Sequence, residues 1–331
     1  MNKLDYIVPN EYGVMLGKTS ERLVISLKGK TIKELPFMFL RSITVHHKGT
    51  CLTTELIQKC CEYGIQINFL DYQNSPMAKL TSPQLCRTIE ILKGQIDSLY
   101  NARGIYLAGK ITENKIKNQK RLLKYFNKYQ SNEKIEDFCS KIDSCLNSFK
   151  NLPLKSLDEE HPTLLGLEGS ASSFYWQAVK EMISDKTNFT GRKTRGAKDL
   201  VNSMLNYGYG ILYSRIWGMV MLAGLEPFLG YIHKDRSGKP SMVLDIIEMY
   251  RIIVDHAVLT YVNNSKKELP EEMTDDIKKE IAEKVLEKLN EYHQYRGKNF
   301  PMESIIQKTV RNISMFLREK SDLDLYTYPL R

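Results

Sequence analysis

The sequence predicts an α+β fold with a small N-terminal β-sandwich-like domain (residues 1–80) and a larger all-α catalytic domain (residues 84–331). Before residue 80, short runs of β-branched and large apolar residues are separated by turn residues such as Pro9, Asn10 and Gly29, which is typical of strands. After residue 84, apolar residues recur at the spacing of long helices. A chain of 331 residues is long enough for two domains.

In the N-terminal part, we expect one helix among several strands. Leu56, Ile57, Cys60 and Cys61 recur at helical spacing within residues 53–63, and Gly64 is a plausible end to that helix. Segment 76–83, which contains two prolines, is the best candidate linker. The strands are expected at residues 6–8, 14–16, 22–27, 42–45 and 65–70.

The C-terminal part reads as a series of helices. We expect an interrupted helical run from residue 92 to about residue 129, and further helices at 170–182, 199–222, 242–262, 271–292 and 301–318. Residues 271–292 show an amphipathic pattern typical of an outer helix, and we assign that helix no function. No helix or strand is assigned to the segment from about 130 to 160.

The amino-acid composition indicates which kinds of partner and compartment to expect. The 48 basic and 39 acidic residues give a formal charge of +9, which favours a polyanionic partner, although many basic proteins bind no nucleic acid. The six cysteines form no CxxC pair and no zinc-binding spacing, so we expect reduced thiols. The N-terminus does not resemble a secretory signal, and the longest apolar run, 216–225, is too short to cross a bilayer. We therefore expect a cytoplasmic protein with no membrane partner.

Three stretches of the helical half carry candidate catalytic groups. Glu168 lies in an apolar run just before the helix expected at Ser170, where a carboxylate is costly to bury unless a cation pairs with it. A helix N-terminal glutamate favoured by the helix dipole is the alternative. His233 follows Gly230, Tyr231 and Ile232, and taken alone it reads as a core or turn histidine.

The third stretch adds two carboxylates. Asp245 and Glu248 follow His233 by 12 and 15 residues and are three apart on an expected helix, so both could face one point. The alternative is a salt-bridged face, because Arg251 comes three residues after Glu248. Carboxylate oxygens and an imidazole nitrogen suit Mg²⁺ or Mn²⁺, either of which can polarise a phosphodiester.

These three stretches occur along the chain together with other motifs, in a particular order. The order is Leu-Gly-Leu-Glu-Gly at 165–169, Asn-Ser-Met-Leu-Asn-Tyr-Gly-Tyr-Gly at 202–210, Ala-Gly-Leu-Glu-Pro-Phe-Leu-Gly-Tyr-Ile-His at 223–233, and then 241–248. Together with Gly-Ile-Gln-Ile-Asn-Phe-Leu-Asp at 64–71, this set resembles the CRISPR-associated spacer-acquisition integrase and endonuclease family. The resemblance implies a metal-dependent enzyme that inserts short DNA spacers into a CRISPR array by 3′-hydroxyl attack on a phosphodiester.

The resemblance also assigns roles to residues. Glu168 matches the family's first metal-binding glutamate, and His233 matches its metal-binding histidine. The third ligand is usually an acidic residue on the next helix, often Asp; spacing favours Glu248, with Asp245 as a supporting acid. These three ligands are also the expected catalytic residues. The implied partners are double-stranded or branched DNA, a second copy of the chain bound through the β domains, and a small ferredoxin-like CRISPR adaptation subunit.

Basic segments are candidates for contacts with DNA. Segment 103–134 carries nine basic residues, and a DNA-binding face and a solvated helix face are equally good interpretations. Tyr207 and Tyr209 are better interpreted as core residues. Segment 186–198 could guide a DNA strand or only be disordered, and the turn at 234–240 could contact phosphate or only be solvated. From these two segments we select Arg192, Arg195, Lys234, Arg236 and Lys239 as DNA-binding candidates.

Two other functions compete with the integrase. The first is a non-catalytic basic helical scaffold that binds nucleic acid or a partner protein. The second is a metallohydrolase that acts on small phosphates, which we rank last because the sequence has no GxxxxGK[ST] phosphate loop.

Overall fold

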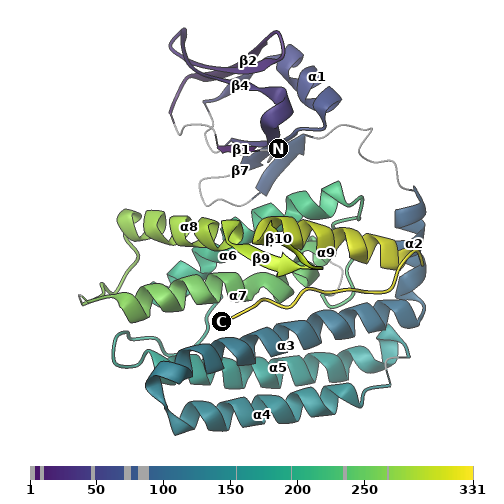
Figure 1. The fold of residues 1–331 in the computed structure, drawn as a ribbon, viewed down its shortest axis with the longest axis vertical. Coiled ribbons are helices and arrows are strands. Elements are labelled where there is room, and N and C mark those ends of the chain that lie inside the picture. The colour runs from purple at the N-terminus through teal and green to yellow at the C-terminus, as the bar shows by residue number, and fades with distance from the viewer. Residues whose placement is uncertain are drawn as a thin grey trace. The chain divides into compact units, whose positions relative to one another are not determined.

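The computed structural model describes residues 4–7, 11–45, 49–70, 76–80, 89–153, 155–194, 196–233, 237–266 and 268–330. The chain divides into two compact units, Met1–Thr88 and Ile89–Arg331 (Figure 1). Each unit has its own hydrophobic core.

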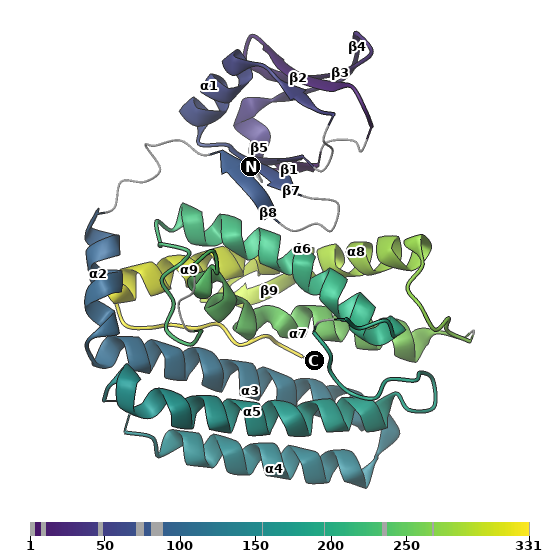
Figure 2. The same ribbon diagram turned by 180° about the vertical axis from the view of Figure 1, so that it is seen from behind.

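The N-terminal unit contains two four-stranded sheets (Figure 2). In the first sheet, strand β5 (Leu40–Val45) is parallel to both β1 (Leu4–Ile7) and β7 (Gln66–Leu70), and β8 (Pro76–Leu80) is antiparallel to β7. In the second, β3 (Arg22–Leu27) is antiparallel to β4 (Lys30–Pro36) and β2 (Val14–Thr19), and β6 (Cys51–Leu52) is parallel to β2. A short 3₁₀ helix, η1 (Phe37–Phe39), precedes β5.

Alternating side chains build the core of this unit. In β2, Val14 and Leu16 are buried while Met15 between them is exposed, as a half-buried strand requires. Helix α1 (Thr54–Tyr63) adds Leu56 and Cys60 to the same core. The expected helix at 53–63 is confirmed: the Thr53 hydroxyl caps it by accepting the Leu56 N–H at 3.2 Å, and Gly64 ends it in the left-handed conformation, with φ of 66°.

Three strands of this unit were not expected. Strand β4 is mostly exposed and polar, so it has no apolar alternation, and its backbone pairing with β3 defines it. The expected linker at 76–83 is wrong over its first part, because Pro76–Leu80 is strand β8. Proline is tolerated there because Pro76 is the first residue of the strand, where a missing N–H does not interrupt the ladder.

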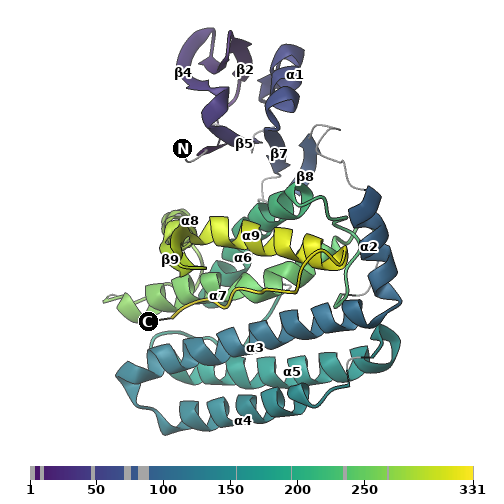
Figure 3. The ribbon, with the colours of Figure 1, turned by 45° about the vertical axis from the view of Figure 1, so that its right-hand side comes forward.

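The C-terminal unit is mainly helical, with α3, α4 and α5 running side by side (Figures 1 and 2). Helix α7 packs against α3, α6 and α8, and α9 packs against α2, α6 and α8 (Figure 3). None of the helices in the described residues is long and apolar enough to cross a membrane. The helices are α2 (Ile89–Leu99), α3 (Ala102–Gln130), α4 (Glu133–Lys150), α5 (Leu157–Met182), α6 (Leu200–Leu222), α7 (Ser241–Asn264), α8 (Asp275–Asn290) and α9 (Met302–Leu317).

Helix α7 is the most informative for function. Apolar residues occur around nearly its whole circumference, as in a helix that is buried on every side. Its acidic residues Asp245, Glu248 and Asp255 are therefore buried as well. Buried carboxylates need polar or cationic partners, so α7 is where a dense polar site is required.

Three features of this unit differ from the expectation. Helix α5 begins at Leu157 and not near Ser170, because packing against α3 and α4 outweighs the unfavourable Pro162, Gly166 and Gly169 within it. Helix α4 lies in the segment that the sequence left unassigned. A hairpin of β9 (Tyr292–Tyr295) and β10 (Lys298–Pro301) follows α8, so this unit is not purely helical.

Candidate active site

The carboxylates of Glu168 and Glu248 meet at one ammonium group. Glu168 lies in the middle of α5, Glu248 on α7 and Lys115 on α3, so three neighbouring helices each supply one charge. Lys115 Nζ is 2.6 Å from Glu248 Oε2 and also forms an ion pair with Glu168 Oε1. The Ser172 hydroxyl donates to Glu168 Oε1 at 2.8 Å.

Burial and charge set the protonation of this cluster. The side chains of Lys115 and Glu248 are only 13% and 9% exposed. Burial alone would raise the pKa of Glu248, but Lys115 and Arg251 outweigh it and lower that pKa to about 2. Burial would lower the pKa of Lys115, but Glu248 and Glu168 outweigh it and raise that pKa. Glu248 and Lys115 are therefore both ionised at neutral pH.

Arg251 supplies the second cation. Its Nε lies 2.9 Å from Glu248 Oε1, so the salt bridge expected from their three-residue spacing is present. The guanidinium also lies 4.7 Å from the centre of the Tyr209 ring. Glu248 thus has a cation at each of its two oxygens.

Asp245 fixes the position of His233. Its carboxylate accepts the backbone N–H groups of Tyr231, Ile232 and His233, and Asp245 Oδ1 is 2.8 Å from His233 Nδ1. The ring of His161 holds the same loop through the Ile232 carbonyl at 2.7 Å. Asp245 is fully buried, and these contacts occupy both of its oxygens. A histidine held at Nδ1 in this way keeps Nε2 for another ligand.

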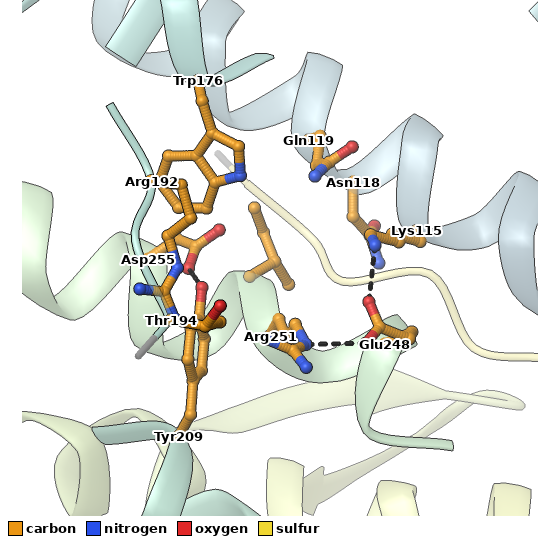
Figure 4. Close-up of a pocket in the computed structure, with 11 residues that line it drawn as sticks. Lys115, Asn118, Gln119, Trp176, Arg192, Thr194, Tyr209, Glu248, Arg251 and Asp255 are labelled. Atoms are coloured by element: carbon orange, nitrogen blue, oxygen red, sulfur yellow. Dashed lines mark hydrogen bonds and ion pairs between the residues drawn. The ribbon is translucent and has the colours of Figure 1, made fainter. Parts of the chain in front are cut away.

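A cavity of about 160 Å³ opens beside Glu248 (Figure 4). Figure 4 shows Arg192 and Trp176 on the side opposite Lys115 and Glu248. The Arg192 guanidinium donates to the side-chain oxygens of Asn202 and Asn206, at 2.9 and 2.7 Å. Burial lowers the pKa of Arg192, and the nearby carboxylates of Asp255 and Asp199 only partly oppose this shift. The cavity is therefore lined by three basic side chains, Lys115, Arg192 and Arg251, and by the carboxylates of Glu248 and Asp255.

Asp255 is a second buried carboxylate that lines the same cavity. The hydroxyls of Tyr175 and Tyr209 both donate to its carboxylate, the former at 2.8 Å. Burial outweighs these hydrogen bonds and raises the pKa of Asp255. The favoured interpretation of Tyr209 as a core residue is confirmed, since it is 7% exposed and packs in the helical core.

Part of a metal-binding set is in place. Two carboxylates converge on one point, and an imidazole held at Nδ1 belongs to the same region, which suits a hard divalent cation in kind. Across the described part of the chain, however, no three His, Cys, Asp or Glu side chains are gathered closely enough to hold a metal ion. Lys115 occupies the point where the two glutamates meet.

The family profile described as "CRISPR associated protein Cas1" matches residues 7–292. This chain belongs to the Cas1 family. A Cas1 relative described as "CRISPR-associated endonuclease Cas1 1", from Archaeoglobus fulgidus, is 30% identical over 333 residues, which span 94% of this chain and 96% of the relative.

Two solved structures share the fold. A casposase bound to integration product is similar with a TM-score of 0.76 and 21% identity, covering 100% of this chain and 94% of the casposase. A chain of a Cas6-RT-Cas1–Cas2 complex has a TM-score of 0.76 and 16% identity, covering 98% of this chain and 36% of that one. At these identities the likeness concerns the fold of the Cas1 family alone.

The predicted site residues of this Cas1 chain fall into three groups. Glu168 and Glu248 share a cation, whereas His233 is bound to Asp245. The expectation that Glu168 lies at a helix N-terminus is wrong, because α5 begins eleven residues earlier, at Leu157. Among the DNA-binding candidates, Arg192 faces the cavity and Lys239 is half-buried beside α7, while Arg195, Lys234 and Arg236 lie outside the described residues.

Two basic segments are held more tightly than the sequence suggested. Lys186 donates to the Asn263 carbonyl at 2.6 Å, and Arg192 binds two asparagines of α6, so this segment is tied to the helical core. Along α3, Lys110 and Lys117 both pair with Glu113. Part of the basic face of α3 is therefore neutralised within the chain.

The role of Lys115 is not marked by any motif. In the sequence Lys115 is one of nine basic residues of segment 103–134, yet it lies on the buried stripe of α3, four residues after Ile111 and seven before Leu122. A polar residue on an apolar stripe needs a buried partner. That position was the available signal.

Proposed function

We propose that this chain is a metal-dependent DNA endonuclease and integrase of CRISPR spacer acquisition. In this proposal, the 3′-hydroxyl of a short DNA attacks a phosphodiester of the repeat array, and Glu168, His233 and Glu248 form the catalytic centre. The cofactor is Mg²⁺ or Mn²⁺. The related hydrolytic activity is cleavage of branched or single-stranded DNA.

The convergence of Glu168 and Glu248 on a single cationic position carries this proposal. Two ionised carboxylates directed at one point repel each other unless a positive charge lies between them, and a divalent ion supplies that charge in phosphoryl-transfer centres. When bound, such an ion polarises the phosphodiester and stabilises the leaving oxygen. Asp245 holds His233 as a supporting acid would.

The cavity supports a phosphate-containing substrate. Lys115, Arg192 and Arg251 line it together with the carboxylates of Glu248 and Asp255. The hydrogen-bonded side-chain partners of Arg192 are neutral asparagines, so a phosphate would give its guanidinium a charged hydrogen-bond partner. On the surface of α5, Gly166 and Gly169 flank Glu168, and an added Cβ at either glycine would meet no atom within 4 Å. The chain's own packing does not require glycine there, whereas close approach of a DNA backbone would favour it.

The proposed assembly is a homodimer joined through the N-terminal β domains, together with a small ferredoxin-like CRISPR adaptation subunit. A structurally similar chain belongs to a Cas6-RT-Cas1–Cas2 complex, which supports an assembly with other CRISPR proteins. The similar casposase is bound to integration product, which supports action on DNA. We place this assembly in the cytoplasm. The five described cysteines are free thiols, which supports a reducing compartment.

A strand-transfer assay tests the proposal. The chain and its adaptation subunit are mixed with short 3′-hydroxyl DNA and a repeat-bearing plasmid, with Mn²⁺, with Mg²⁺ or with EDTA. Glu168→Gln and Glu248→Gln are expected to abolish joined product. Glu181→Gln on the same helix as Glu168 serves as a matched control, because Glu181 pairs with Lys134 at the surface. Tight DNA binding without joined or nicked product in any metal would favour the non-catalytic scaffold.

A further inference from the structure

The ammonium of Lys115 lies where a divalent ion would have to bind. It contacts one oxygen of Glu168 and one of Glu248, at 2.6 Å from the latter. A magnesium ion requires oxygen ligands at about 2.1 Å and leaves no room for an amine between them. The ammonium and the ion therefore exclude each other.

The charge balance of the site leads to the same conclusion. Glu168 and Glu248 supply two negative charges, while Lys115 and Arg251 supply two positive charges. Without metal the cluster is electrically balanced, which explains how two carboxylates persist at this depth. A divalent ion added to the unchanged cluster would leave two excess positive charges in a poorly solvated site, so one cation has to withdraw.

Lys115 is the cation that can withdraw. Arg251 is planar and lies against the Tyr209 ring, whereas the ammonium of Lys115 ends a flexible four-carbon chain. Lys115 also lines the cavity of about 160 Å³, which gives the displaced amine a space to enter. There it would join Arg192 and Arg251 and face an arriving phosphate.

We infer that Lys115 is a positioning residue that holds Glu168 and Glu248 together in the metal-free protein and yields its place to the divalent ion. This inference rests on the proposed function, because it presumes that these carboxylates bind a metal. It adds that metal binding includes the displacement of an internal cation, and that the displaced ammonium becomes available to DNA phosphate.

The test measures Mn²⁺ affinity without DNA, by isothermal titration of the full chain and of Lys115→Met. If the ammonium occupies the site about nine-tenths of the time, its removal should tighten the Mn²⁺ dissociation constant about tenfold. Lys115→Arg keeps a cation and should not tighten it. Lys117→Met is the matched control, because it removes a lysine of the same helix whose partner Glu113 also pairs with Lys110.

Thermal unfolding provides a second measurement. Lys115→Met should unfold at a lower temperature than the unmodified chain without metal, and saturating Mn²⁺ should raise its midpoint by more. If Lys115→Met does not fold, Lys115→Gln, which keeps hydrogen-bonding capacity without the charge, takes its place in both measurements.

The outcomes separate the inference from the function. Tighter Mn²⁺ binding by the neutral variant alone supports the inference, since a merely structural lysine would weaken binding when removed. Equal or weaker binding in the neutral variant overturns the inference and leaves the metal-dependent function standing. Absence of Mn²⁺ binding in the unmodified chain and in the neutral variant overturns both.

Discussion

Asp245 Oδ1 lies 2.8 Å from Nδ1 of His233, and the same carboxylate accepts three consecutive backbone N–H groups of the loop that carries this histidine. One buried side chain therefore fixes both the ring of His233 and the backbone beneath it. This is a positioning role, because the contacts already occupy both oxygens of Asp245 and leave metal binding to other groups.

Asp245→Asn should separate positioning from catalysis. The amide keeps the shape of the carboxylate but has one acceptor oxygen, so it leaves at least one buried N–H group of Tyr231, Ile232 or His233 without a partner. We expect a loss of about 1–3 kcal/mol of unfolding free energy in urea and at least a tenfold loss of strand transfer. Asp143→Asn, at a carboxylate that is 45% exposed and pairs with Lys120, should change neither. Unchanged activity in Asp245→Asn would contradict this role.

Gly169→Ala should raise stability and lower activity. Alanine in a helix interior is more stable than glycine by about 0.5–1 kcal/mol, and the added Cβ meets nothing within the chain. If DNA passes close to α5 beside Glu168, the same methyl group should reduce strand transfer. Gly210→Ala in α6, which also has open space at its Cβ, should be stabilised with unchanged activity. Full activity in Gly169→Ala would remove the support for close DNA approach at this point.

Tyr175→Phe should weaken the buried cluster around Asp255. The phenol donates to Asp255 Oδ2 at 2.8 Å, and its removal leaves a buried carboxylate with one hydrogen-bond donor fewer. The expected loss is about 1–3 kcal/mol of unfolding free energy, measured by urea denaturation. Tyr106→Phe, at a 39% exposed ring, is the control and should change stability little. Equal losses in the two variants would show that the Asp255 contact contributes nothing specific.

His256 should make stability depend on pH. Burial lowers its pKa to about 3, so the unfolded chain takes up a proton below pH 6.5 and the native chain does not. Its contribution is fully present above pH 6.5 and is lost as the pH falls towards 3, at up to about 1.4 kcal/mol per pH unit. Between pH 7.5 and 5, His256→Phe should lose roughly 2 kcal/mol less unfolding free energy than the unmodified chain. Parallel pH profiles would contradict the buried neutral state of His256.

Most of the fold follows from periodicity, because the strands and helices with regular apolar spacing could be located in the sequence. The exceptions have physical causes. Strand β4 carries almost no buried side chain, and its identity lies in backbone pairing with β3. The start of α5 was misplaced because Pro162, Gly166 and Gly169 disfavour a helix locally, whereas tertiary packing with α3 and α4 decides the outcome.

The candidate site was only partly accessible from the sequence. Motifs mark Glu168, His233 and Glu248, and the three-residue spacing of Glu248 and Arg251 predicts their salt bridge. The pairing of Lys115 with the two glutamates depends on how distant helices pack, which no motif encodes. The contacts of the two residues favour Glu248 over Asp245 as the third ligand. Both oxygens of Asp245 accept hydrogen bonds from the loop that carries His233, whereas Glu248 shares a cation with Glu168.

Strand transfer by His233→Ala in Mn²⁺ tests the proposed metal-dependent centre most directly. His233 is half-buried and joined to the fold through Asp245, so its truncation should leave the structure and DNA binding intact. The assay compares the unmodified chain, His233→Ala and a metal-free control, each with the adaptation subunit, 3′-hydroxyl DNA and a repeat-bearing plasmid. We expect metal-dependent joining by the unmodified chain and none by His233→Ala. Undiminished joining by His233→Ala, or joining in EDTA, would contradict a metal-dependent centre at this site.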